Sequence, residues 1–483
     1  MVAVACLSSY AKSDKPKLVV GIVVDQMRWD YLQYYYNDYC EGGFKRLLGE
    51  GFSCDNNLIN YLPTVTAIGH SSVYTGATPA IHGIAGNNFQ INGKDAYCCK
   101  DETVEAVGSK NDAGKMSPHN LLATTIGDQL RLATDFKSRV VGVALKDRAA
   151  ILPAGRSANA AYWYDAKAGK FVSSTYYMKE LPKWVDNFNG KISIKPGEDP
   201  KMLAIGATMT FDMAEAAVKN EKLGKGDYTD MICVSISSTD AISHTYGTRC
   251  KENKDVFMAT DKGLAHFLSF LDQEVGKGEY LVFLSADHGG CHNPNYLAEH
   301  KIAATGWDGN KAINDINTKL AAKYGKEGKY ISTIMDSRIY LNHNWLEANN
   351  IDVQDVKDFA VKELRKDTDL QWVVDMEHAA SASVPQMIRE RIINGYNMHR
   401  SGDIIVLPRP AGFTWAYDSN YKGASHYNWN PYDAHIPLVF MGWNINHGRT
   451  SKPTFIVDIA ATICDMLKIQ APNGCIGNPI TLE

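Results

Sequence analysis

Residues 18–25, with the sequence LVVGIVVD, form a run of apolar and β-branched residues that ends in an acid. Three further runs have the same design: RVVGVALKDR at 139–148, MICVSISSTD at 231–240 and YLVFLSADH at 280–288. Short continuous apolar runs are typical of strands buried on both faces of a parallel sheet. The sequence therefore predicts that these four strands form the centre of an α/β fold.

Each of these runs delivers ionisable residues to its carboxyl end. In open α/β sheets the ligand crevice lies at the carboxyl ends of the strands. Aspartates and histidines in such numbers are the ligands that zinc or another divalent metal would use. We therefore expect the chemistry of the protein at the residues gathered there, namely Asp25, Lys146, Arg148, Asp240, His244, Asp287 and His288.

Helical patterns separate the predicted strands, at residues 120–133 and 254–275. Alternation of strand and helix predicts a doubly wound, mostly parallel sheet sandwiched by helices. We expect one such domain over residues 16–483, in which HIPLVFM at 435–441 returns to the core as a further strand.

Two stretches interrupt the alternation and are expected to be insertions. Residues 153–200, rich in Gly, Lys, Tyr and Trp, are interpreted as a cap near the site, whose aromatic side chains either line a leaving-group pocket or pack. Residues 332–410 have the order strand, helix, strand, helix, strand, which predicts a small inserted α/β lobe.

Composition excludes several classes of protein. The formal net charge of −4 and the lack of a basic stripe argue against a nucleic-acid partner. No run approaches the roughly 18 apolar residues of a transmembrane helix. Among the 10 cysteines there is no CxxC pair, so a metal would sit on Asp and His.

Residues 1–15 resemble an export-signal remnant, with Ser9-Tyr10-Ala11 as a cleavage site and without the usual positive start; a disordered end is the alternative. This favours a periplasmic or secreted bacterial protein. In such a compartment some of the cysteines are expected to pair.

The segment PTVTAIGH at 63–70 places Thr66 just before a predicted helix. Free N–H groups and the helix dipole favour an anion such as phosphate there. The alternative is that Thr64 or Thr66 only caps the helix.

The joint order of these motifs along the chain is more specific than any one of them. It resembles the two-zinc members of the alkaline phosphatase superfamily, and most of all the phosphate-irrepressible, PafA-type bacterial alkaline phosphatases. Those enzymes use a threonine nucleophile and a Lys-x-Arg pair, here Lys146-Asp147-Arg148. The order consists of Asp25, Thr66, Asn87, Asp240-x3-His244, Asp287-His288 and a late His426.

The resemblance implies two Zn²⁺ ions, one held by Asp240, His244 and His426, the other by Asp25, Asp287, His288 and Thr66. The spacing of Asp240 and His244 agrees with this assignment, because residues four apart share one face of a helix. The late ligand is either His426 (GASHYNW) or His435 (YDAHIPL); the context favours His426, and His435 opens a buried-looking strand.

Taken singly, these residues have simpler interpretations. Asp25 and Asp287 could cap helices, His244 could be a core histidine, and Lys146 and Arg148 could be solvated or pair with Asp147. Their joint order favours the metal site.

The resemblance implies hydrolysis of phosphate monoesters, with broad specificity, through a phosphothreonine on Thr66. Asn87 and the Thr66 N–H would bind phosphoryl oxygens, together with Arg148 and Lys146. Two added cations favour monoesters, which carry more negative charge than diesters.

A diesterase of the nucleotide pyrophosphatase/phosphodiesterase type is the alternative, and a cell-envelope phosphotransferase is a further one. A sulfatase is disfavoured because Thr66 is followed by Ala67-Ile68-Gly69 and not by a C/S-x-P-x-R motif. The resemblance also implies a monomer.

Overall fold

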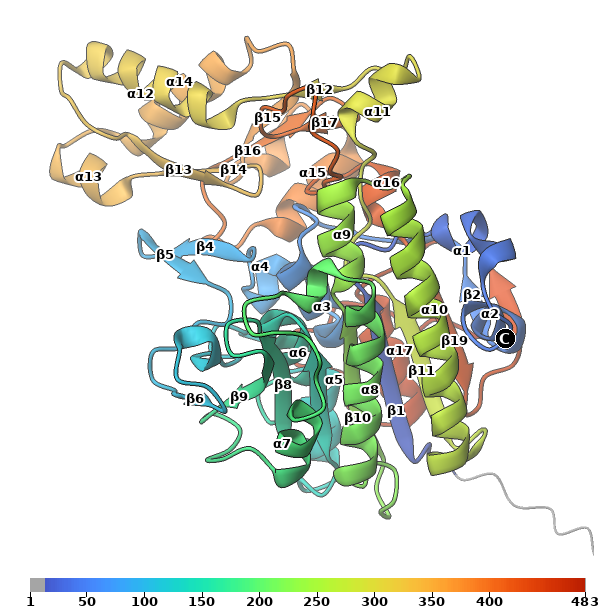
Figure 1. The fold of residues 1–483 in the computed structure, drawn as a ribbon. Helices are drawn as coiled ribbons and strands as arrows, with labels where there is room; N and C mark the ends of the chain where they lie inside the picture. Colours follow the sequence, from blue (N-terminus) through green and yellow to red (C-terminus); the bar gives the residue numbers. More distant parts are fainter. Residues whose placement is uncertain (1–13, 483) are drawn as a thin grey trace, which may run out of the picture.

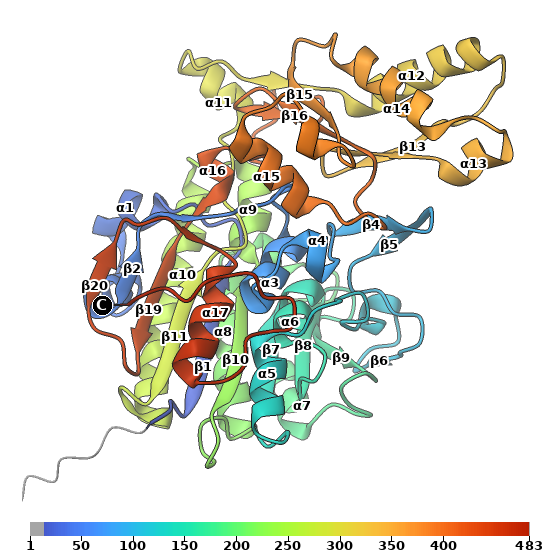
Figure 2. The ribbon, with the colours of Figure 1, turned by 180° about the vertical axis from the view of Figure 1, so that it is seen from behind.

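The computed structural model describes residues 14–482, so nearly all of the expected export signal lies outside the described residues. A ten-stranded sheet with helices on both faces forms the centre of the molecule (Figures 1 and 2). In spatial order its strands are β20 (Gly448–Thr450), β2 (Phe52–Cys54), β19 (Leu438–Gly442), β11 (Tyr280–Ser285), β1 (Leu18–Val24), β10 (Asp230–Ile236), β7 (Val140–Ala144), β8 (Ala160–Asp165), β9 (Lys170–Ser174) and β6 (Ala106–Val107).

The four predicted strands are neighbours in the middle of this sheet. β1 lies between β11 and β10, β7 follows β10, and all four are parallel and in continuous register. Every residue of these strands is buried. The prediction of a doubly wound α/β core is thus confirmed.

The expected return strand is present but begins later than predicted. β19 pairs antiparallel with β11, whereas His435 and Ile436 form β18, which pairs with β3 (Asn57–Leu58) outside the central sheet. Pro437 separates the two pieces, and it lacks the N–H that a continuous ladder needs.

Helices cover both faces of the sheet (Figures 1 and 2). One face carries α8 (Ile205–Asn220), α9 (Ser238–Tyr246) and α10 (Lys251–Leu271), and the other carries α3 (Thr66–Thr75), α5 (Ile126–Ala133), α6 (Asp147–Ala154) and α17 (Asp458–Leu467). The helix predicted at 120–133 begins only at Ile126, because Thr125 and Asp128 form a capping box there. The helix predicted at 254–275 is α10.

Residues 153–200 do not form a cap near the site. They contribute β8 and β9 to the edge of the central sheet, followed by α7 (Lys183–Asn189). Tyr162 and Trp163 are buried in the packing of this edge, and the indole N–H of Trp163 donates to the carbonyl of Ala113. The aromatic residues of β8 are therefore strand core.

The second insertion is an α/β lobe with its own sheet and hydrophobic core. Its four strands, in spatial order, are β13 (Ile331–Met335), β14 (Arg338–Leu341), β16 (Ile404–Pro408) and β15 (Leu370–Asp375). Both views place the lobe beyond the end of the sheet from which α9 starts (Figures 1 and 2).

The predicted order of elements in the lobe is observed, with α14 (Val353–Leu364) and α15 (Gln386–Gly395) as its helices. The structure adds β13, α13 (His343–Ala348) and the preceding α12 (Gly309–Tyr324), which packs on β13 and α14.

Within residues 14–482, none of the helices is long and apolar enough to cross a membrane. The nine cysteines in this part of the chain are free thiols, so the expected pairing is not observed among them.

Candidate active site

The ends of β1 and β11 bring three ligand atoms together. Asp25 follows β1 directly, and Asp287 and His288 follow β11 after one residue; all three side chains are fully buried. His288 Nε2 lies 3.6 Å from Asp25 Oδ1 and 3.5 Å from Asp287 Oδ2.

Thr66 completes this first cluster from α3. It is the first residue of the helix, and its Oγ1 lies 3.4 Å from His288 Nε2. Ligand atoms of a tetrahedral zinc ion, at about 2.0–2.1 Å from the metal, are separated from one another by about 3.3–3.4 Å. The observed spacing therefore fits one such ion.

The capping alternative does not describe this threonine. Val65 occupies the cap position of α3, and no side chain makes a capping hydrogen bond there. The hydroxyl of Thr64 instead donates to the carbonyl of Asn428.

The packing of α3 fixes Thr66 relative to Asp25, Asp287 and His288. Gly69 lies so close to the end of β11 that an added Cβ would be 2.2 Å from the carbonyl oxygen of Asp287. No side chain separates α3 from the segment that carries Asp287 at this contact.

Two buried oxygen atoms in the first cluster have no hydrogen-bond partner among the described residues, namely Asp25 Oδ1 and Asp287 Oδ2. Burial, and then the neighbouring carboxylates of Asp240 and Asp287, raises the pKa of Asp25 well above its usual value. Such atoms are costly to bury unless a cation or a donor meets them. His288 Nδ1–H donates to the carbonyl of Gly289 at 2.8 Å, which leaves the Nε2 lone pair facing the cluster.

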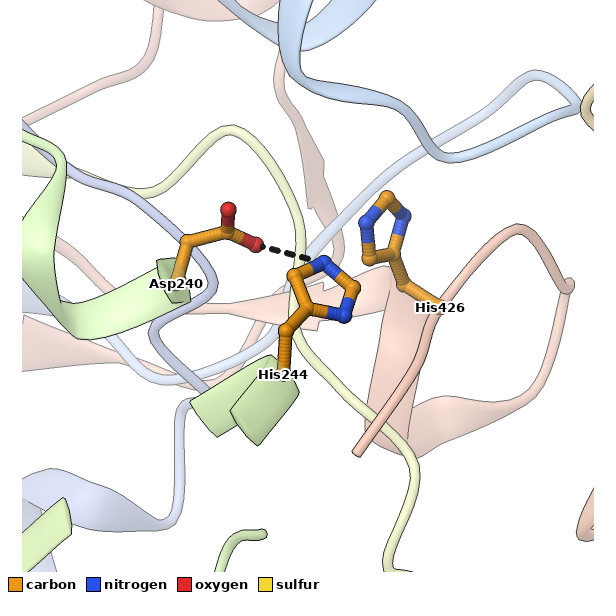
Figure 3. Close-up of side chains that lie close together, drawn as sticks. All are labelled: Asp240, His244 and His426. Atoms are coloured by element: carbon orange, nitrogen blue, oxygen red, sulfur yellow. Dashed lines mark ion pairs between the residues drawn. The ribbon is translucent and has the colours of Figure 1, made fainter. Parts of the chain in front are cut away.

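A second cluster joins α9 to a late loop (Figure 3). Asp240 and His244 lie one turn apart on α9, with Asp240 Oδ1 3.1 Å from His244 Nε2, and His426 faces them. The Nδ1–H groups of His244 and His426 donate to the carbonyls of Ala424 and Thr64, at 3.0 and 2.6 Å. Both rings thus direct Nε2 into the cluster.

The pKa of His244 is shifted in the opposite direction from those of His288 and His426. Burial lowers the pKa of His288, and it lowers that of His426 well below the usual value. Although burial also lowers the pKa of His244, the Asp240 carboxylate outweighs this and raises it. The His288 and His426 rings stack at 3.8 Å and so connect the clusters.

His435, the alternative late ligand, lies outside both clusters. Its Nε2–H donates to the carbonyl of Asp55 at 2.8 Å, and its ring stacks on Trp29 at 4.5 Å.

Lys146 lies between the two clusters. It follows β7, and its Nζ is 2.6 Å from Asp25 Oδ2 and 2.5 Å from Asp240 Oδ2. Although burial lowers the pKa of Lys146, the carboxylates of Asp240 and Asp25 raise it overall, so the ammonium is charged. This lysine is not a solvated loop charge.

Asn87 lies beside the start of α3, and Arg148 lies on α6, which packs on α3. Arg148 Nη1 donates to the Tyr97 hydroxyl at 3.1 Å but lies 4.0 Å from the Asp147 carboxylate, so the pair with Asp147 is loose. Asn87 Oδ1 accepts from the backbone N–H of Ala67 at 3.0 Å, which leaves its NH₂ group as a donor.

Sequence reasoning missed two residues of the site. Gln26 donates from its backbone to Asp287 Oδ1 and from Nε2 to Asp240 Oδ1, at 3.1 and 2.7 Å. His70 donates to the carbonyl of Thr66 at 2.9 Å and lies 3.2 Å from Asp287 Oδ2. The four-residue spacing of His70 from Thr66 on one helix face was a usable signal, whereas the amide of Gln26 follows no ligand pattern.

The family profile described as "Type I phosphodiesterase / nucleotide pyrophosphatase" matches residues 19–433. The chain belongs to this family. Within the type I phosphodiesterase/nucleotide pyrophosphatase family, the chain is 46% identical to a Myroides odoratus protein named calcium-transporting ATPase, over 99% of this chain and 97% of that protein. It is 43% identical to alkaline phosphatase PafA of Elizabethkingia meningoseptica, over 97% of this chain and 94% of PafA.

Solved structures agree with these relationships. The crystal structure of wild-type alkaline phosphatase PafA matches with a TM-score of 0.92 at 42% identity, over 96% of this chain and 98% of that chain. Murine ectonucleotide pyrophosphatase/phosphodiesterase 5 matches with a TM-score of 0.59 at 14% identity, which shows a shared fold. The predicted resemblance to the alkaline phosphatase superfamily is confirmed.

Proposed function

We propose that this protein is an alkaline phosphatase that hydrolyses phosphate monoesters through a phosphothreonine on Thr66. The observation that carries the proposal is the placement of Thr66 Oγ1 in a buried Asp-Asp-His cluster, with the charged Lys146 between that cluster and a second one. The names of two relatives, the alkaline phosphatases PafA and PhoV, support it.

The donor set fits two zinc ions. Asp25, Asp287, His288 and Thr66 would hold one, and Asp240, His244 and His426 the other. Neutral imidazole and carboxylate donors with an open position are typical of catalytic zinc. When bound, the two ions would supply Lewis-acid stabilisation of negative charge on the entering and leaving oxygens of an in-line displacement.

The residues of the chain perform the remaining tasks. Thr66 Oγ forms a bond to phosphorus while the bond from phosphorus to the leaving alcohol oxygen breaks, and a water later cleaves the phosphothreonine to release phosphate and restore the hydroxyl. The fixed position of α3 orients Thr66 for both steps. Positioning of this kind supplies a large part of the rate of phosphoryl transfer.

Three groups would bind the phosphoryl oxygens: the backbone N–H of Thr66, the NH₂ of Asn87 and the guanidinium of Arg148. The ammonium of Lys146 adds a positive charge between the clusters. Because a monoester carries more negative charge than a diester, these cations favour the monoester. A diesterase activity is therefore the weaker candidate.

Two candidates for other functions make testable predictions. An envelope phosphotransferase would release the phosphoryl group faster to an added alcohol than to water. The Myroides relative is named a calcium-transporting ATPase, so the assays should include ATP as a substrate.

The deciding assay measures kcat/KM of the zinc-loaded protein on an aryl phosphate and on the matching methyl aryl phosphate diester. We expect a strong monoester preference, and in Lys146→Ala a loss on the order of 10²-fold or more for the monoester with a much smaller loss for the diester. The exposed Lys110→Ala serves as the control.

Equal losses on both substrates would show that Lys146 does not discriminate the extra charge. The absence of zinc-dependent activity on either substrate would refute the hydrolase. We also infer that the protein is exported, monomeric and broad in specificity. The N-terminal sequence supports export, which cell fractionation tests. Sedimentation of the purified protein tests the monomeric state.

A further inference from the structure

Gln26, which directly follows the ligand candidate Asp25, lies between the two ligand clusters. β1 pairs with β11 on one side and with β10 on the other. Asp287 follows β11, and Asp240 lies on α9, which follows β10. The residues at the end of β1 are therefore placed between a ligand of the first cluster and a ligand of the second. Gln26 is only 2% exposed.

Gln26 contacts each cluster through a different group. Its backbone N–H donates to Asp287 Oδ1 at 3.1 Å, and its side-chain Nε2 donates to Asp240 Oδ1 at 2.7 Å. The same side-chain nitrogen lies 3.3 Å from His244 Nε2. The main chain of Gln26 thus contacts the first cluster, whereas its side chain contacts two ligand candidates of the second.

The backbone of Gln26 has a left-handed conformation, with φ at +59°. Residues other than glycine adopt this conformation uncommonly. A turn imposes it here, because the Met27 N–H donates to the carbonyl of Val24 at 3.2 Å. Uncommon backbone conformations that the surrounding structure maintains are concentrated at functional sites. In this turn, one residue presents its N–H to Asp287 and its side chain to Asp240.

Packing and charge fix the orientation of the Gln26 amide. Gly290 lies against it, where an added Cβ would be 2.9 Å from Gln26 Oε1 and 3.0 Å from Gln26 Cδ. The reversed amide would direct Oε1 at the Asp240 carboxylate, and two acceptors repel each other, so Nε2 faces Asp240. Lys146 Nζ contacts the other oxygen, Asp240 Oδ2, at 2.5 Å. Each oxygen of the Asp240 carboxylate therefore has a donor, and the two donors fix its plane.

We propose that Gln26 is a positioning residue that links the two metal sites, and that its side-chain amide orients the Asp240 carboxylate toward the ion of the second cluster. Hydrogen bonds to a ligating carboxylate fix its orientation, and their loss typically lowers metal affinity by about 10- to 100-fold. This inference rests on the proposed zinc-dependent function. It adds that the second site depends on a residue of the strand end that carries Asp25.

The test removes the amide and keeps the backbone donor. Gln26→Ala and Gln26→Met, the second of similar length to glutamine, both lack the Nε2 donor, while the N–H that contacts Asp287 remains. Native mass spectrometry over a range of buffered free zinc counts the ions per chain. In both variants we expect one ion to bind with wild-type affinity and the other to bind about tenfold or more weakly. Thermal unfolding of each variant establishes that the fold is intact.

Two further variants identify the affected site. His426→Ala is expected to retain only the ion of the first cluster, whose affinity should stay within about twofold when Gln26→Ala is added. Gly290→Ala should weaken the second ion in the wild-type background by displacing the amide, but should have no further effect in Gln26→Ala. Gln129→Ala is the matched control, because Gln129 is also buried but its Nε2 donates to Thr124 Oγ1 on α5's side of the sheet. Both ions should bind to it as to the wild type.

Excess zinc separates a positioning role from a direct role in the reaction. Because the proposed amide acts only through Asp240, saturating zinc should restore the kcat/KM of Gln26→Ala on an aryl phosphate to within about threefold of the wild-type value by mass action. A larger loss that persists at saturating zinc would overturn the assignment of Gln26 as a positioning residue.

Wild-type affinity for both ions in Gln26→Ala and Gln26→Met would overturn the proposal, and so would equal weakening of both ions. Wild-type affinity in Gln26→Met alone would also overturn it, because packing and not the hydrogen bond would then be responsible. Failure of the phosphatase function is a separate result, in which the wild-type protein binds two ions but hydrolyses neither ester.

Discussion

The two ligand clusters are built in different ways. Asp25, Asp287 and His288 all follow neighbouring strands of the central sheet and are fully buried. In the second cluster Asp240 and His244 lie on a helix, and 32% of the His244 side chain is exposed. Its third member, His426, comes from a loop far along the chain.

This difference predicts that different interactions maintain the geometry of the two clusters. The first cluster is part of the core, so its geometry is maintained by the same packing that stabilises the sheet. The second depends on a loop held by hydrogen bonds such as that of His426 Nδ1 to Thr64. We therefore expect loss of a ligand to affect folding in the first cluster and mainly metal binding in the second.

The largest effect should come from Asp287→Ala compared with His244→Ala. Each should lower kcat/KM on the order of 10³-fold or more. In the metal-free protein Asp287→Ala should cost about 2–3 kcal/mol of unfolding free energy, because the backbone N–H groups of Gln26 and His288 lose their acceptor. His244→Ala should cost less than about 1 kcal/mol.

Urea unfolding after chelation measures this difference, and metal analysis monitors zinc content. Equal destabilisation by the two substitutions would contradict the distinction between a cluster built on the sheet and one built on a helix and a loop.

A smaller effect separates the two late histidines. His426→Ala should lower the zinc content from two ions per chain to one, whereas His435→Ala should leave two ions bound. His435 is hydrogen-bonded to Asp55 instead, so its removal should lower stability by only about 1 kcal/mol. Mass spectrometry of the native proteins counts the ions. If His435→Ala lost one ion and His426→Ala kept two, His435 and not His426 would be the zinc ligand.

The smallest effect is on pH dependence in the metal-free protein. The folded-state pKa of His288 is lowered, so the unfolded state binds the proton more tightly and stability falls as pH drops below about 6.5. The folded-state pKa of His244 is raised, so its contribution is complete below about 6.5 and is lost as pH rises through the folded value.

Substitution by Gln should therefore be less harmful at pH 5.5 than at pH 8 for His288 and more harmful at pH 5.5 for His244. Each pKa unit corresponds to about 1.4 kcal/mol. Unfolding curves of chelated protein at the two pH values measure this, and a change of the same sign in both variants would contradict it.

The first cluster was predictable because sequence and structure are directly linked there. Continuous apolar runs mark buried parallel strands, and an acid at the end of a run falls at the edge where such strands terminate. The lobe was likewise predictable in its order of elements, since its helices are amphipathic and its strands short.

The parts that failed depend on contacts between distant segments. Local context favoured His426 over His435, but the hydrogen bonds to Thr64 and Asp55 that separate the two histidines could not be read from the sequence. β8 was missed because the composition of residues 153–200 predicted an insertion and left its aromatic residues either to line a pocket or to pack; pairing with β7 makes them core. Asp336 of the lobe lies against Gly86, where an added Cβ would be 2.6 Å from Asp336 Oδ2, and this contact depends on where the whole lobe lies.

The contact of Gly69 with Asp287 couples Thr66, the proposed nucleophile, to the stability of the whole domain. With only a hydrogen atom at the contact, α3 cannot slide or rotate on β11 without steric overlap. Partial opening of the molecule would thus separate Thr66 from Asp25, Asp287 and His288 at the same time as it breaks the core. Activity and global folding are expected to disappear in a single cooperative transition on heating, with no partly active intermediate.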